Sequence, residues 1–158
     1  MKMKQVRIKH AWSVLCSGVS IDRNSNNASL FNVIEQINAP RRNLIEVTSE
    51  DKPELAIPMD MNLVSSWYRA GDDPVSADIK VEVHDPLGNK RELESYHVDM
   101  NGDVRRVRLL AYWQGIRASV SGRYIFNLLV REDGSQDFIK GGEAAIDVHI
   151  LDKGGEEK

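Results

Sequence analysis

The chain has 158 residues and a mass of 17.8 kDa, with 41% hydrophobic and 28% charged residues. A chain of this length buries enough apolar surface to fold as one domain without disulfides or structural metals. Its 11 glycines, 5 prolines and 1 cysteine exclude the collagen-like, low-complexity and disulfide-rich secreted classes. We therefore expect a single globular domain over residues 1–158.

The net charge of −3 hides a blocky distribution along the chain. Residues 1–49 carry seven basic and three acidic side chains, and residues 50–103 carry five and thirteen. Residues 104–131 carry six arginines and no carboxylate, and the remainder carries three basic and eight acidic side chains. Because opposite charges pair across neighbouring strands of a sheet, we expect the Arg-rich strand near Arg106 and Arg108 to lie beside Glu92 and Glu94.

The N-terminus does not predict a signal peptide or a membrane segment. Basic residues come first, but the apolar run that follows, residues 11–19, is interrupted by Ser13, Ser17 and Gly18. No run approaches the length of about 18 apolar residues that a membrane-spanning helix needs. The lone Cys16 sits among apolar neighbours, which is typical of a small buried residue in a reducing compartment. We expect a cytoplasmic protein.

The predicted elements begin with a long hairpin, in which residues 12–21 and 28–37 flank a polar turn at residues 22–27. Residues 38–55 follow as a longer loop, and a second excursion covers residues 132–142. Between and after them, apolar residues alternate with polar ones with a period of two, which indicates half-buried strands. These strands are expected around residues 57–67, 78–84, 90–98, 107–113, 124–130 and 144–150.

Turn residues support the same interpretation. Asp85-Pro86-Leu87-Gly88 has the composition of a type I turn that closes a hairpin. No segment is a convincing helix, and the tail at residues 152–158 is expected to be frayed. The fold class predicted is all-β: a single antiparallel β-sandwich, immunoglobulin-like or C2-like, with eight or nine strands.

Four stretches resemble a family of small uncharacterised bacterial β-sandwich proteins. They are the Leu15-Cys16 strand, the Ser29-Leu30 return strand, the Asp-Pro-x-Gly hairpin at residues 85–88 and the Gly-x-Tyr-x-Phe strand that begins at Gly122. The resemblance covers residues 10–150 and implies an immunoglobulin-like or C2-like sandwich. It implies no activity, because the family has none to transfer. This chain departs from the family pattern at residues 38–55 and in its Arg-rich strand.

The sharpest catalytic hypothesis is a metal site. His97 and Asp99 stand two residues apart, so on a strand they project from one face. With a distant third ligand such as His149, they would form a two-histidine, one-carboxylate facial triad. The alternative is that all three are solvent-facing polar residues. The sequence has no P-loop, dinucleotide fingerprint, nucleophile elbow or zinc cysteine pair, so no cofactor is expected.

The basic residues are candidates for binding. Arg105, Arg106 and Arg108 precede Tyr112, and guanidinium groups bind phosphate while aromatic rings stack on bases. The acidic total and a pI near 5.8 argue against a nucleic-acid partner. Tyr124 is expected to pack at a corner of the sandwich. In the first long loop, Arg41 and Arg42 are exposed candidates, and Phe138 is one in the second.

Our preferred hypothesis from the sequence is therefore a non-enzymatic β-sandwich that binds a protein partner or its own copy through strand edges and long loops. The first alternative is a metal-dependent enzyme that uses His97, Asp99 and His149. The second is an anion or single-stranded nucleic-acid binder. The sequence identifies no small-molecule substrate.

Overall fold

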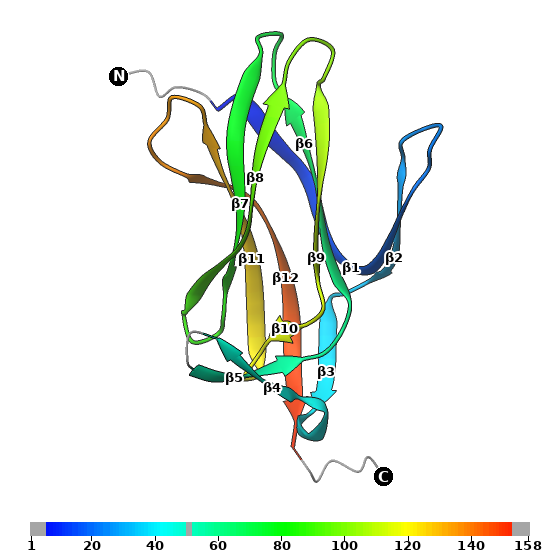
Figure 1. The fold of residues 1–158 in the computed structure, drawn as a ribbon, viewed down its shortest axis with the longest axis vertical. Helices are drawn as coiled ribbons and strands as arrows, with labels where there is room; N and C mark the ends of the chain where they lie inside the picture. The colour runs from blue at the N-terminus through cyan, green and yellow to red at the C-terminus, as the bar shows by residue number, and fades with distance from the viewer. Residues whose placement is uncertain (1–5, 50–51, 153–158) are drawn as a thin grey trace.

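A computed structural model describes residues 6–49 and 52–152, and in these ranges the only helical element is a 3-10 turn, η1 (Arg41–Asn43). The twelve strands described form three sheets (Figure 1). The four-stranded sheet has the spatial order β2 (Ala28–Val33), β1 (Ile8–Ile21), β6 (Met61–Arg69), β9 (Arg106–Trp113). The five-stranded sheet has the order β3 (Gln36–Pro40), β12 (Ile139–Leu151), β11 (Gly122–Glu132), β7 (Val75–His84), β8 (Lys90–Met100). The small sheet has the order β10 (Ile116–Arg117), β5 (Lys52–Ile57), β4 (Ile45–Ser49).

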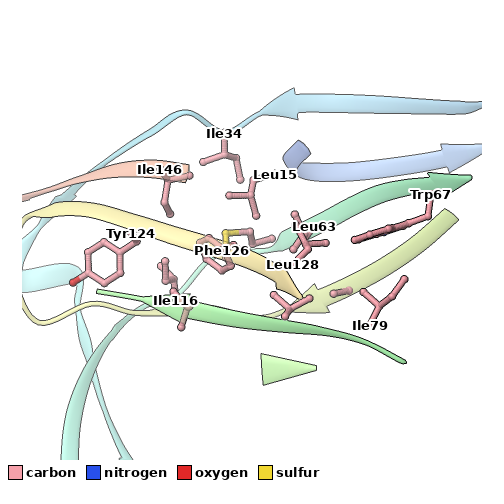
Figure 2. Packing of buried hydrophobic residues seen from close by; sticks show 14 of the residues in the cluster. Leu15, Ile34, Leu63, Trp67, Ile79, Ile116, Tyr124, Phe126, Leu128 and Ile146 are labelled. Atoms are coloured by element: carbon pink, nitrogen blue, oxygen red, sulfur yellow. The ribbon is translucent and has the colours of Figure 1, made fainter. Parts of the chain in front are cut away.

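One hydrophobic core joins the two larger sheets. Alternate residues of β7 and β11 are buried, as their period of two predicts. Figure 2 shows Phe126 and Leu128 of β11 near Leu63 and Trp67 of β6, and all four belong to the same buried cluster. The predicted all-β class is therefore confirmed.

A β-bulge in β1 reverses the direction in which its side chains point. His10 faces Trp67 of β6, but the next aligned pair is Trp12 with Ser66, so Ala11 is an extra residue. Before the bulge, His10 is on the core side of the sheet. After it, Leu15 is on the core side, and Trp12 with its same-face neighbours turns to the opposite, outer side.

The two larger sheets are in close contact where a second bulge, in β12, lies beside the first. A Cβ atom at Gly141 would lie 2.7 Å from the ring of Trp67, and one at Gly142 would lie 2.5 Å from the ring of His10. The rings of His10 and Trp67 themselves pack edge to face, with their centroids 5.2 Å apart. Glycine is required here because the two rings occupy the space of a side chain.

Two buried charged side chains hold the chain where it passes between sheets. The carboxylate of Glu132, at the end of β11, accepts the backbone N–H groups of Arg7 and Ile8 and forms an ion pair with the Arg7 guanidinium. Arg69, 5% exposed at the end of β6, donates to the carbonyls of Met100 and Gly102 at 2.8 and 3.0 Å. Arg69 thereby fixes the turn between β8 and β9.

The structure corrects two expectations about the strands. Within the described ranges there are twelve strands in three sheets, where eight or nine strands were predicted. Residues 38–55 are not one long loop, because they contain the end of β3, η1 and most of the β4–β5 hairpin. The predicted frayed tail lies outside the described residues except for Asp152.

The predicted pairing of the Arg-rich strand with Glu92 and Glu94 is wrong. Strand β9 pairs with β6, where Ser66 faces Arg108 and Tyr68 faces Arg106. The turn after β8 carries the chain to the other large sheet, so β8 and β9 are edge strands of different sheets. Strands β8 and β9 therefore follow each other in the sequence but do not pair in a sheet.

Two local predictions are confirmed. Gly88, with φ of 87°, donates its N–H to the Asp85 carbonyl and closes the hairpin between β7 and β8. Tyr124 is 2% exposed, and its hydroxyl donates to the carbonyl of Val120 at 2.8 Å. No helix in the described ranges is long and apolar enough to cross a membrane.

We expect Gly141→Ala to lower the free energy of unfolding by about 1–3 kcal/mol, because the new methyl group would press on the fully buried Trp67 ring. Equilibrium chemical denaturation measures this change. Gly18→Ala is the matched control, since its Cβ would meet Phe31 at an ordinary 3.7 Å. A Gly141→Ala protein as stable as Gly18→Ala would contradict the close approach of the sheets.

We expect His10 to contribute a loss of stability as the solution is acidified through the ordinary histidine pKa of 6.5, whereas His97, whose pKa is raised, contributes in the opposite direction. Burial lowers the pKa of His10, and its Nε2 has no hydrogen-bond partner within the described ranges. Near pH 6 the His10 imidazole therefore binds a proton more readily in the unfolded chain than in the folded chain. Denaturation curves between about pH 7.5 and about pH 5.5 should show a smaller loss for His10→Gln than for the wild type. Equal losses would mean that His10 is not involved.

Candidate functional site

The outer side of the four-stranded sheet carries an apolar surface, which we call the outer apolar face. The bulge in β1 directs the contribution of that strand to it, and the registers of β2, β6 and β9 align the rest. Its members are Trp12, Val14, Cys16, Phe31, Val33, Val64, Leu110 and Tyr112. This is a second apolar side of a sheet whose other side already faces the core.

The middle of this face is covered and its margins are open. Cys16 and Val64 are both 0% exposed although neither belongs to the core cluster. At the margins, Phe31 is 54% exposed and Tyr112 is 51% exposed. Burial raises the pKa of the Cys16 thiol, which is consistent with the predicted small buried residue and not with a reactive nucleophile.

The β1–β2 hairpin stands out from the rest of the molecule, at the right of Figure 1. Its tip is held by Arg108 of β9, which donates to the carbonyl of Asn26 at 2.6 Å. Within the tip, the Asp22 carboxylate accepts from the backbone N–H groups of Asn24 and Ser25, and these hydrogen bonds hold the pKa of Asp22 below its usual value. Arg108 therefore links the edge strand β9 to the turn between β1 and β2.

Strand β2 is the outermost strand of this hairpin, and residues 28–33 contain no charged side chain. The other edge of the same sheet, β9, carries Arg106 and Arg108. Edge strands β8, β4 and β10 also carry charges, and β3 ends at Pro40. Charges and prolines are the usual means by which proteins block unwanted pairing at an edge, and β2 has neither.

The structure separates the five predicted binding arginines. Arg41 and Arg42 lie in η1, where Arg41 pairs with Asp152 at 2.5 Å. Arg105 pairs with Asp72 at 2.6 Å, and this interaction lowers the pKa of Asp72.

The remaining two, Arg106 and Arg108, share one side of β9 with Tyr112, as the alternation predicted. Arg106 donates to the Ser66 hydroxyl at 3.2 Å. Neither Arg106 nor Arg108 pairs with a carboxylate in the described part of the chain.

The structure does not assemble the predicted metal triad. His97 lies between two carboxylates, with Asp78 at 2.8 Å and Asp99 at 3.4 Å, and the Asp78 contact raises the pKa of His97. His149 is on β12, which is separated from β8 by β11 and β7, and it pairs in register with Asn38. No group of three His, Cys, Asp or Glu residues within the described ranges is arranged to hold a metal ion.

Phe138 is not the free loop residue that the sequence suggested. Its ring lies against the Lys80 ammonium and the Arg131 guanidinium, each 4.5 Å from the ring centre. In contrast, sequence reasoning missed Phe31 and Val33, because a strand with alternating apolar residues is expected to bury them. The uncharged run at residues 28–34 was the available signal.

No protein-family model matches this chain, and no curated protein matches its sequence. An alkylpurine DNA glycosylase from Pseudomonas fluorescens, bound to DNA containing an abasic site analog, has a TM-score of 0.46 at 12% identity; the match covers 92% of this chain and 31% of that chain. A beta-glucosidase from Listeria innocua in complex with glucose has a TM-score of 0.42 at 10% identity. The match covers 89% of this chain and 16% of that chain. This chain spans less than a third of the length of either protein, and neither match assigns it a function.

Proposed function

We propose that the protein is a non-enzymatic interaction module that forms a homodimer through strand β2. The observation that carries the proposal is the edge of β2 beside the exposed Phe31 and Val33, which has no charge and no proline and whose one residue of positive φ is Asn32. Such an edge offers backbone donors and acceptors to a further strand, and neighbouring side chains supply apolar contacts. Antiparallel pairing of two β2 strands would join two four-stranded sheets into one.

Charge favours a second copy at this edge over the other edges. In a two-fold dimer, each edge strand pairs with itself, so any charge near the axis meets a like charge. Self-pairing of β9 would bring Arg106 and Arg108 together with their own copies, which is unfavourable. Self-pairing of β2 has no such cost, because residues 28–33 are neutral.

The expected dimer is weak. One six-residue strand and a few side chains form an interface at the small end of the range for specific complexes, below about 1,200 Å² in total. We therefore expect a dissociation constant in the micromolar range or weaker, and a monomer–dimer equilibrium at ordinary working concentrations.

We further propose an immunoglobulin-like or C2-like sandwich for the fold family, supported by two features. The two larger sheets share one core, and the Tyr124 hydroxyl bonds to a carbonyl four residues upstream, as in the tyrosine corner of such sandwiches. A cytoplasmic location is supported by the free, buried Cys16.

We expect sedimentation or light scattering with mass analysis to show self-association that increases from about 10 µM to about 1 mM. Phe31→Lys should weaken the dimer by roughly tenfold or more, because it removes apolar area and places like charges near the two-fold axis.

Leu87→Lys is the matched control, since Leu87 is 67% exposed in the turn between β7 and β8 and should leave the equilibrium unchanged. A strict monomer at about 1 mM would overturn the proposal and would leave a partner of a different kind as the occupant of β2. A dimer insensitive to Phe31→Lys would place the interface elsewhere.

A further inference from the structure

A pocket of about 990 Å³ lies between the small sheet and the end of the five-stranded sheet where β7 turns into β8. Figure 1 shows β4 and β5 lying across the lower part of the molecule, beside that turn. The apolar part of its wall includes Leu55, Val83, Ala118 and Tyr124. Val83 and Tyr124 are 6% and 2% exposed and belong to the main core, so the base of the pocket is formed by well-packed side chains.

Two arginines in this pocket share one carboxylate. Oε2 of Glu54 accepts from Arg117 at 3.0 Å and from Arg91 at 3.4 Å. A guanidinium has five N–H donors, and Oε2 of Glu54 is the sole hydrogen-bond acceptor of either side chain in the described part of the chain. Within this cluster two positive charges face one negative charge, and many guanidinium donors are unused, while the lining as a whole has equal numbers of basic and acidic side chains.

The other acidic residues of the pocket are engaged elsewhere or lie at its margin. Asp85 accepts hydrogen bonds from the N–H groups of Leu87 and Asn89 at 2.9 Å within its own turn. Glu92 lies 3.8 Å from Lys80, and Glu46 is exposed on β4. None of these three carboxylates forms an ion pair with Arg91 or Arg117 in the described part of the chain, although the charge of Asp85 favours the charged form of Arg91.

The electrostatic environment of Arg91 is unfavourable for a lone cation. The side chains of Arg91, Arg117 and Glu54 are 36%, 34% and 38% exposed, so solvent screens them only in part. Burial and the charge of Arg117 lower the pKa of Arg91, and the charges of Glu54 and Asp85 offset this lowering only in part. An additional anion between the two guanidinium groups would relieve this repulsion.

We propose that this pocket binds a small organic carboxylate, with its carboxylate between Arg91 and Arg117 and its apolar body against Leu55, Val83 and Tyr124. The planar fork of guanidinium donors matches the two oxygens of a carboxylate. The apolar residues at the base of the pocket can contact the hydrocarbon part of an organic anion, which an inorganic anion lacks. This ligand site is independent of the β2 edge, so the two proposals succeed or fail separately.

The test titrates the whole chain at low salt with benzoate, acetate or inorganic phosphate. Calorimetry measures the affinity of each probe, and NMR of the arginine Nε–H signals identifies the arginines that it contacts. We expect benzoate to shift the signals of Arg91 and Arg117 and to bind more tightly than acetate or phosphate. Absence of shifts at both arginines would overturn the proposal, and so would phosphate binding as tightly as benzoate.

Two substitutions give opposite expected results. Arg117→Gln should weaken benzoate binding by roughly tenfold or more, and Glu54→Gln should strengthen it, because removing the internal carboxylate frees both guanidinium groups. Arg105→Gln, which alters an exposed arginine paired with Asp72, is the matched control and should have no effect.

If Arg117→Gln fails to fold, Glu54→Gln and the probe series decide the question. Unchanged or weaker benzoate binding in Glu54→Gln would show that the three side chains are a structural ion cluster only.

Discussion

The extra residue at Ala11 in β1 is the constraint on which the rest of the four-stranded sheet depends. A strand has a side-chain period of two, so one inserted residue exchanges the two faces for everything that follows. His10 is thereby kept on the core side, where it packs against Trp67. Trp12 and the residues that alternate with it instead cover the outer side. Strand β1 contributes Trp12, Val14 and Cys16 to the outer apolar face because of this single insertion.

The bulge also determines how the two larger sheets meet. At the same level, β12 has its own extra residue, Gly141, and the adjoining Gly142. Only glycine leaves room for the Trp67 and His10 rings there. The sheets are thus brought together on the β1–β12 side by two irregularities of the backbone. Packing at this contact positions β1 and, through it, the hairpin that carries β2.

The positive and negative charge blocks of the sequence do form ion pairs with each other. The pairs join other strands than the predicted pair of the Arg-rich strand with the strand of Glu92 and Glu94. Arg123 of β11 pairs with Asp147 of β12 at 2.9 Å, and Arg131 pairs with Asp78 of β7 at 2.8 Å. The Arg91–Glu54–Arg117 cluster joins strands of different sheets. Compensation is therefore incomplete in two places, at this cluster and at Arg106 and Arg108 on β9. Only the first of these lies in a surface for which we propose a ligand, since β9 is the edge opposite to β2.

The sequence by itself determined the all-β class and most of the long strands, since alternation and turn residues act locally, but it did not predict the short strands β4, β5 and β10. The positions of β7, β8, β9, β11 and β12, the turn at Asp85 and the burial of Cys16 and Tyr124 were all predictable in this way. Only the tertiary structure decided which strands are neighbours, because the pairing of β9 with β6 and the position of β2 at an edge are set by packing between distant segments. For the same reason Phe31, Val33 and the Arg91–Glu54–Arg117 pocket could not be found from spacing: their partners are brought together by sheet order and by two bulges that leave no trace in the alternation.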